Sequence, residues 1–233
     1  MAIHILAMVL GLLVFVGIGM VEDPRRPLYP RGLVIGVFGR MGAGKTLYST
    51  EVARRYLAAG YTVWANYPID FTALGLPEVE VITSWGEMVD LSGGLVLVDE
   101  AHLWAPSWDQ KALTLGDRML ISQLRKRSLD LMVVSQHPAR IAKTLRELLT
   151  DVIYTQAYRW GIFFVKTFDP DELGGSMTRV GKTSAKPMRI RLTRINSIVA
   201  AAYQTMGTVA VSSALVDRVD KRPAGGSDTD DSE

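Results

Sequence analysis

The feature that most constrains the fold is a glycine-rich turn that joins an apolar run to a helical pattern. Residues 33–38, LVIGVF, are a continuous apolar run of strand length, and residues 39–46 read GRMGAGKT. Residues 46–60 then carry apolar side chains at helical spacing and end at Gly60. The turn matches the pattern G-x-x-x-x-G-K-[ST] in full, in the strand-to-helix context in which that pattern binds phosphate. The sequence therefore predicts a strand, a phosphate-binding loop and a helix at the start of an α/β domain.

Each position of this loop has an expected task. The glycines permit close backbone approach, so that successive N–H groups can surround a phosphate chain. We expect Lys45 to contact the β- and γ-phosphates during catalysis, and the Thr46 hydroxyl to bind a metal ion. The predicted nucleotide-binding residues are Gly39, Arg40, Met41, Gly42, Ala43, Gly44, Lys45 and Thr46. The cofactors implied by this loop are ATP and Mg²⁺.

An acidic pair follows a second apolar strand. Residues 94–98, GLVLV, precede Asp99 and Glu100. On a parallel strand beside the loop, Asp99 would lie near Mg²⁺, usually through a water molecule, and Glu100 could accept a proton from the attacking water. The alternative is an acidic pair that caps the next helix. Residues 99–102, DEAH, also label a class of helicases, but 233 residues leave little room for two tandem motor domains.

A third buried strand is predicted at residues 129–136, LDLMVVSQ, and it ends at Gln136. If this strand lies between the loop strand and the Asp99 strand, Gln136 would sense the γ-phosphate and orient water as a catalytic residue. The alternative is a surface strand end. We expect His137 to be an exposed loop residue and not a catalyst.

Strands and helices alternate along most of the chain. Further strands are predicted at 62–67, 76–83 and 151–160, and helices at 112–127 and 140–150. This alternation predicts an α/β fold with a mainly parallel sheet flanked by helices, as in RecA-like P-loop NTPases. Residues 161–170 and 188–195 alternate in hydropathy and predict an antiparallel extension, and residues 197–216 predict a closing helix and strand.

The two ends of the sequence differ from its centre. Residues 1–21 contain no acid, Lys or Arg, so we predict a transmembrane helix at 1–22, with a cleaved signal or a packed helix as alternatives. The Pro- and Arg-rich connector 23–31 would keep the main domain on the cytoplasmic side of a host inner membrane, or inside a virion membrane. The ATPase domain is predicted at 32–216 and a disordered polar and acidic tail at 217–233.

Composition excludes several classes of function. The absence of cysteine excludes a disulfide framework, a thiolate metal site and a cysteine nucleophile. The formal net charge of +2 is too small to indicate a nucleic-acid binder overall, so a DNA-binding surface would have to be a local patch.

Four arginines are candidates for a finger that reaches the ATP of a neighbouring subunit, or for contacts with a nucleic-acid backbone. Arg125 and Arg127 end a predicted helix, and Arg140 and Arg146 follow the predicted sensor strand. The alternative for the first two is a solvated helix end. The sequence does not choose among the four.

The order GRMGAGKT, VLVDEAHLW, an Arg-bearing helix and LDLMVVSQHPARI resembles the additional-strand, catalytic-Glu P-loop ATPases of the FtsK and HerA type. Within that class it is similar to genome-packaging ATPases of tailless, membrane-containing double-stranded DNA phages and to the zonula occludens toxin (Zot) family of filamentous-phage assembly proteins. The resemblance covers residues 33–160. It implies the phosphate and metal roles of Lys45 and Thr46, the metal role of Asp99, the base role of Glu100 and the sensor role of Gln136.

This resemblance leads to three hypotheses. We expect a hexameric, membrane-anchored, Mg²⁺-dependent ATPase that moves double-stranded DNA into a viral particle, with viral capsid or membrane proteins as partners. The first alternative is an assembly ATPase that drives virion extrusion at the host inner membrane. It is disfavoured because such proteins usually have their transmembrane segment after the ATPase domain. The second alternative is a nucleotide-dependent membrane scaffold.

Overall fold

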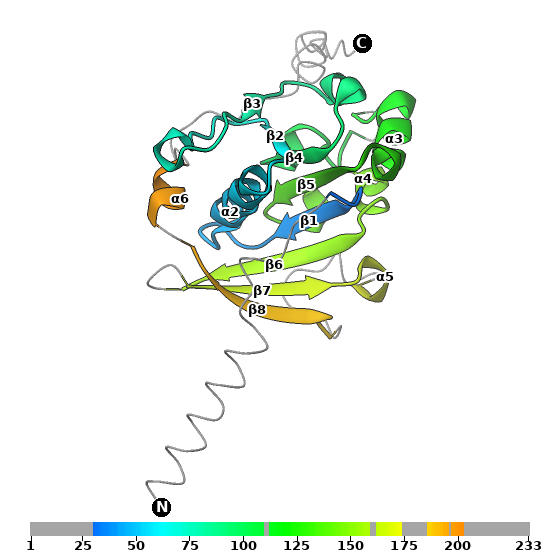
Figure 1. Cartoon of the computed structure of the whole chain (residues 1–233). Coiled ribbons are helices and arrows are strands. Elements are labelled where there is room, and N and C mark those ends of the chain that lie inside the picture. Colours follow the sequence, from blue (N-terminus) through cyan, green and yellow to red (C-terminus); the bar gives the residue numbers. More distant parts are fainter. Residues whose placement is uncertain (1–29, 110–111, 159–161, 174–185, 196, 203–233) are drawn as a thin grey trace, which may run out of the picture.

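An eight-stranded sheet is the centre of the fold (Figure 1). The computed structural model describes residues 30–109, 112–158, 162–173, 186–195 and 197–202. The strands are β1 (Val34–Phe38), β2 (Thr62–Ala65), β3 (Glu80–Val81), β4 (Gly94–Val98), β5 (Leu129–Ser135), β6 (Asp151–Ala157), β7 (Ile162–Phe168) and β8 (Arg189–Arg194). Their order in the sheet is β3-β2-β4-β5-β1-β6-β7-β8.

The sheet has a parallel part and an antiparallel part. Strands β1 to β6 pair in parallel, whereas β7 pairs antiparallel with both β6 and β8. The arrowheads of β1 and β6 therefore point to the same edge in Figure 1, and β7 runs back from it. The predicted mainly parallel sheet with an antiparallel extension is confirmed, and β5 lies between β1 and β4 as expected.

Helices cover both faces of this sheet, as predicted. One face packs against α2 (Lys45–Ala58) and α6 (Ser197–Ala202), which also contact each other. The other face packs against α3 (Leu115–Ser122), α4 (Lys143–Arg146) and α5 (Pro170–Leu173). Short 3₁₀ helices complete the layers: η1 (Thr72–Leu74), η2 (Trp85–Asp90), η3 (Ala101–Leu103), η4 (Leu124–Arg127) and η5 (Pro138–Arg140). Every residue of β4 and β5 is buried, which explains their continuous apolar runs.

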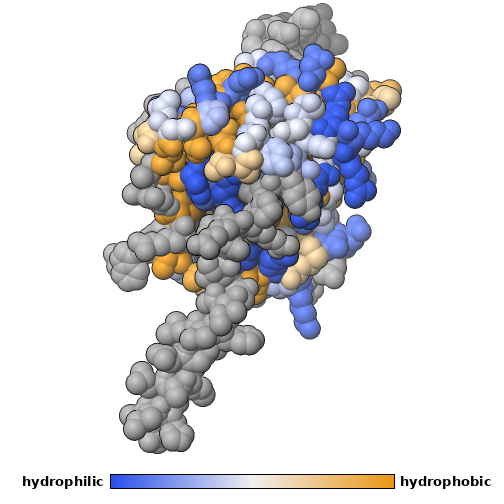
Figure 2. Space-filling view, in the orientation of Figure 1, coloured by the Kyte–Doolittle hydropathy of each residue, from blue (hydrophilic) through white to orange (hydrophobic). Residues whose placement is uncertain are grey.

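The helix predicted over 112–127 is shorter and interrupted. A capping box between Thr114 and Asp117 begins α3, and the chain then tightens into η4. This turn packs tightly on the start of the domain, since a Cβ added to Gly32 would lie 2.1 Å from the Arg125 Cα. Ser128, with φ 49°, then directs the chain into β5. Tertiary packing therefore overrides a local helical pattern here. Figure 2 shows hydrophilic residues gathered on the side of the molecule that carries α3.

The helix predicted over 140–150 is reduced to the single turn of α4. The backbone before it pairs with the loop that follows β4: Ser107 N–H donates to the Arg140 carbonyl at 2.9 Å, and Ala142 N–H donates to the Ala105 carbonyl at 2.7 Å. An antiparallel bridge joins Pro106 and Ile141. Backbone groups engaged in this pairing cannot also form helical bonds.

A buried carboxylate holds the edge of the sheet at which the parallel strands begin. Asp130, 1% exposed, accepts hydrogen bonds from the backbone N–H groups of Arg31 and Leu33, each at 2.8 Å, and from the Tyr56 hydroxyl. Burial and the neighbouring Asp130 raise the pKa of Tyr56, which keeps this hydroxyl protonated as a donor. The three bonds join the chain before β1, the end of α2 and β5.

The membrane-anchored location predicted from the sequence is corrected. Among the described residues, no helix is long and apolar enough to cross a bilayer. The segment 1–22 and the tail 217–233 lie outside the described residues, and so does the closing strand predicted after α6. The membrane location consequently plays no part in the function proposed below.

Candidate nucleotide site

The glycine-rich loop lies between β1 and α2, at the edge where the parallel strands end (Figure 1). Gly42 and Gly44 have φ values of 74° and 75°, a region that favours glycine. Gly44 is the N-cap of α2, and its carbonyl accepts the Tyr48 N–H at 2.9 Å as the first helical bond. A Cβ on Gly42 would meet nothing within 4 Å, so the outer curve of the loop is open. Unpaired N–H groups at the start of α2 are therefore available to bind an anion.

Lys45 points back into this loop. Its Nζ donates to the Arg40 carbonyl at 3.1 Å, and the residue is only 8% exposed. Burial lowers the pKa of Lys45, while the carboxylates of Glu100 and Asp99 act in the opposite direction. The ammonium group thus lies between the loop and the acidic pair, where a phosphate chain would need a positive charge.

Asp99 lies beside Thr46, which joins the two halves of the site. The Thr46 hydroxyl lies close enough to the Asp99 carboxylate to lower the pKa of that group, and Asp99 is 4% exposed. Burial raises the pKa of Asp99, although the hydrogen bonds from Thr46 and from the Glu100 backbone oppose this effect.

One hydroxyl and one carboxylate are a donor set that suits Mg²⁺, because this ion keeps several waters and takes further oxygens from phosphates. In the described part of the chain, no group of three or more His, Cys, Asp or Glu side chains could hold a metal alone. Thr46 and Asp99 would therefore share the ion with the nucleotide.

Glu100 has an unusual backbone conformation. Its φ of 46° and ψ of 47° place a non-glycine residue in the left-handed region, which costs roughly 1–3 kcal/mol and is concentrated at functional sites. Its N–H donates to Asp99 Oδ1 at 2.7 Å, so the strained residue is fixed to its neighbour. The turn directs the two carboxylates differently, and the Glu100 side chain remains 34% exposed.

His102 contacts Glu100 without a well-formed hydrogen bond. His102 Nδ1 lies 3.1 Å from Glu100 Oε2, within ion-pair range, yet neither atom has a hydrogen-bond partner of good geometry. The Glu100 carboxylate therefore keeps the capacity to accept a proton from a water molecule.

Asn66 is a site residue that the sequence did not reveal. It directly follows β2 and is fully buried, and its side chain bonds the backbone of Asp99 twice. Asp99 N–H donates to Asn66 Oδ1 at 2.7 Å, and Asn66 Nδ2 donates to the Asp99 carbonyl at 2.9 Å. The side chain thus continues the pairing of β2 with β4 beyond their ends. The only signal in the sequence was a polar residue near the end of the β-rich run predicted at 62–67.

Gln136 directly follows β5, at the edge of the sheet that carries the loop. Ser135 at the end of β5 pairs with Phe38 of β1, so the next residue lies level with Gly39 at the start of the loop. Gln136 is half-buried there. His137 is also half-buried; its Nδ1 accepts the Ala139 N–H at 3.0 Å, and burial together with Arg140 and Arg146 lowers its pKa.

The four arginine candidates occupy opposite edges of the sheet. Arg125 and Arg127 precede β5, which has 7 residues and separates them from the loop edge by about 20 Å. Arg127 also donates to the Val89 carbonyl. Arg140 is exposed and, with the half-buried Arg146, lies close enough to His137 to affect its pKa. Of the four, Arg140 therefore combines exposure with a position beside the predicted sensor.

The fold is similar to that of a solved toxin domain. The N-terminal domain of zonular occludens toxin from Neisseria meningitidis superposes with a TM-score of 0.50 at 15% identity, over 74% of this chain and 98% of that domain. The genome-packaging NTPase B204 of Sulfolobus turreted icosahedral virus 2 matches with TM-scores of 0.46 in its sulfate complex and 0.43 in its ATP-gammaS complex, both at 12% identity. These matches cover 72% and 75% of this chain and 98% and 100% of B204.

No protein-family model matches the chain, and no curated protein does so. The resemblance inferred from the motifs, to toxin-like and packaging ATPases, is confirmed at the level of the fold by the toxin domain. The chain consequently shares the fold of that toxin domain, with a mainly parallel sheet that helices cover on both faces.

Proposed function

We propose that the chain is a Mg²⁺-dependent ATPase that uses hydrolysis of ATP to ADP and phosphate to move double-stranded DNA into a viral particle. The parallel order β4-β5-β1 carries the ATPase part of the proposal, because it brings Asp99 and Thr46 to the same edge of the sheet. It joins the phosphate-binding loop to the acidic strand end, which are the two halves that this chemistry requires.

The residues of the site have distinct tasks in hydrolysis. The N–H groups of the loop and the Lys45 ammonium hold the phosphates and balance charge on the γ-phosphate. Gln136 orients a water molecule, and Glu100 accepts its proton as the water oxygen attacks the γ-phosphorus and the bond to the β,γ-bridging oxygen breaks. Mg²⁺, when bound by Thr46 and Asp99, would neutralise negative charge on the phosphates.

The DNA substrate and the ring assembly rest on the motif series, which resembles that of packaging ATPases. Six copies in a ring would bring an arginine of one subunit to the ATP of the next, and Arg140 is the exposed candidate at the edge that carries the loop. The alternative is an assembly ATPase that drives virion extrusion. The fold match to the toxin domain, with a TM-score of 0.50, favours that alternative, because the extrusion hypothesis comes from the resemblance to the toxin family.

Phosphate release by the full chain, with and without double-stranded DNA, tests this proposal. We expect Mg²⁺-dependent turnover that DNA stimulates several-fold, and loss of nucleotide binding or turnover in Lys45→Ala. Unchanged turnover in Lys45→Ala would overturn the site assignment. Stimulation by virion coat protein and none by DNA would favour extrusion, and normal virus assembly with a hydrolysis-dead Glu100→Gln chain would favour a scaffold.

A further inference from the structure

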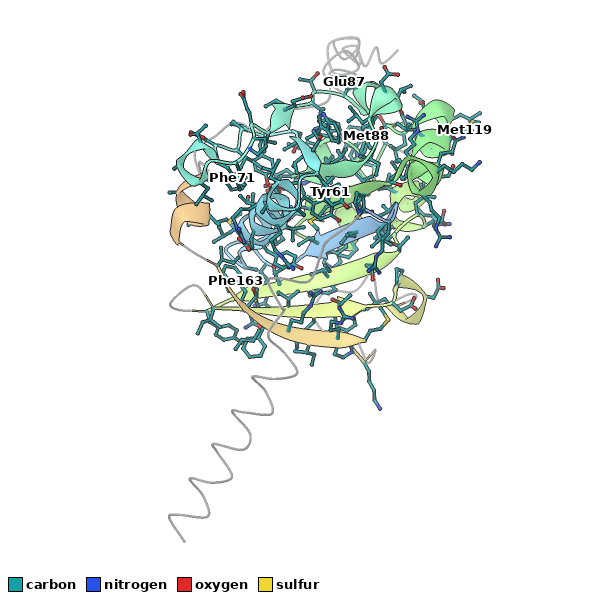
Figure 3. All side chains as sticks on the ribbon, viewed as in Figure 1. Tyr61, Phe71, Glu87, Met88, Met119 and Phe163 are labelled. Carbon is teal, nitrogen blue, oxygen red and sulfur yellow. The ribbon has the colours of Figure 1, made fainter. Side chains whose placement is uncertain are left out.

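An aromatic side chain of the antiparallel extension lies directly behind the phosphate-binding loop. A Cβ added to Gly44 would lie 2.1 Å from Cε1, 2.9 Å from Cζ and 3.1 Å from Cδ1 of Phe163, so the ring edge packs on the Gly44 Cα. Phe163 is 2% exposed and belongs to β7 (Figure 3). The contact links two parts of the chain that are more than a hundred residues apart.

The pairing of β7 explains why this ring faces the loop. Phe163 lies opposite Ala157 of β6 and Thr193 of β8, so its neighbours in the sheet are small and leave room for the ring. Side chains alternate along a strand, and the adjacent Phe164 therefore points to the other face. There its ring packs on Tyr158 with a centroid separation of 5.2 Å.

We propose that Phe163 is a positioning residue for nucleotide binding, an inference that rests on the proposed ATPase function. Gly44 must keep a left-handed conformation, with φ 75° and ψ 23°, to begin α2 and to direct the following N–H groups at the phosphates. The Phe163 ring fills the space behind Gly44 and prevents the loop from relaxing into it. The position of β7 consequently sets the affinity of the loop for nucleotide, and a displacement of β7 would move the loop through the contact between Phe163 and Gly44.

Equilibrium binding of a fluorescent ATP analogue to the full chain measures this role. We expect Phe163→Ala to weaken binding about tenfold and Phe163→Leu to weaken it less, because leucine fills part of the ring volume. Phe164→Ala is the matched control, since it also removes a phenyl ring from β7 but on the other face of the sheet. This variant should bind within twofold of the wild type. Thermal unfolding of each variant verifies that the proteins compared are folded.

A pair of substitutions separates positioning from a general loss of packing. Gly44→Ala alone would place its methyl group into the ring and should abolish measurable binding. Gly44→Ala combined with Phe163→Ala removes the obstacle and should bind at least about tenfold more tightly than Gly44→Ala alone, although the strained φ remains. A merely structural role predicts that the double variant binds no better than Gly44→Ala, and that result would overturn the inference.

The outcomes also distinguish this inference from the proposed function. If the wild type binds the analogue no better than Lys45→Ala does, the nucleotide site itself is wrong and both proposals fail. If the wild type binds in a Lys45-dependent manner and Phe163→Ala binds within twofold of it, only the role of Phe163 is refuted.

Discussion

Removal of the Asn66 side chain tests how the acidic strand end is held. Asn66→Ala deletes both bonds to Asp99 and leaves the Asp99 N–H and carbonyl without partners in a fully buried place. A buried polar group left unsatisfied costs about 1–3 kcal/mol. The free energy of unfolding should therefore fall by about 2–6 kcal/mol, out of the roughly 5–15 kcal/mol typical of a domain.

The same substitution should affect catalysis more than binding. Asp99 and Glu100 would lose their fixed position, and a displacement of about 1 Å can reduce a rate about 100-fold. The loop that binds the phosphates belongs to β1 and α2 and should keep its affinity for ATP. We therefore expect a fall in kcat of about ten- to a hundredfold with a dissociation constant for ATP within about threefold of the wild type.

Urea unfolding followed by tryptophan fluorescence measures the stability change, because Trp64, Trp85 and Trp104 are buried. Thr62→Ala is the control, at the exposed start of the same strand, and should change the free energy of unfolding by less than about 0.5 kcal/mol. An Asn66→Ala protein as stable as this control, with normal kcat, would refute the role assigned to the two bonds.

Three further predictions concern the opposite edge of the sheet, the region beside the sensor and the metal. Asp130→Ala should lower the free energy of unfolding by about 2–4 kcal/mol in urea, because three hydrogen bonds to a buried carboxylate are lost, while ATP affinity of the folded protein stays unchanged. His137 should titrate below its ordinary pKa of 6.5 in an NMR pH series, and Arg140→Gln should raise the midpoint. In the wild type, the unfolded chain binds a proton at His137 more readily than the native chain does, so the free energy of unfolding should fall as the pH falls through 6.5. A midpoint at or above 6.5 would contradict the contacts described for His137. Chelation by EDTA should reduce phosphate release to background, Mg²⁺ should restore it, and Thr46→Ala should require more Mg²⁺ for half-maximal rate; EDTA-resistant turnover would exclude the metal assignment.

Local patterns in the sequence were sufficient for the main parts of the site. GRMGAGKT identified the loop because its glycines and lysine are adjacent in the chain, and the apolar run before Asp99 identified the strand that carries the acid. The strand predicted at 129–136 differs from β5 by one residue, so the place of Gln136 at the strand end followed from the same kind of pattern.

Contacts between distant segments could not be predicted in this way. Asn66 bonds a residue 33 positions away, and Phe163 reaches Gly44 only because β7 folds back beside β6. In the sequence, Asp130 resembles an ordinary strand residue, because its three hydrogen-bond donors come from residues far away in the chain. The two helices that were predicted too long failed for the same reason, since backbone pairing at Ile141 and tight packing at Gly32 depend on segments elsewhere in the chain.

The central claim is that Glu100 is the base of an ATP-hydrolysing site. Steady-state phosphate release and ATP binding should be measured for Glu100→Gln beside the wild type. We predict that kcat falls at least about 100-fold, within the range that a general base contributes, while the affinity for ATP changes by less than about threefold. Turnover within about threefold of the wild type would contradict the assignment of Glu100 and the hydrolysis mechanism built on it.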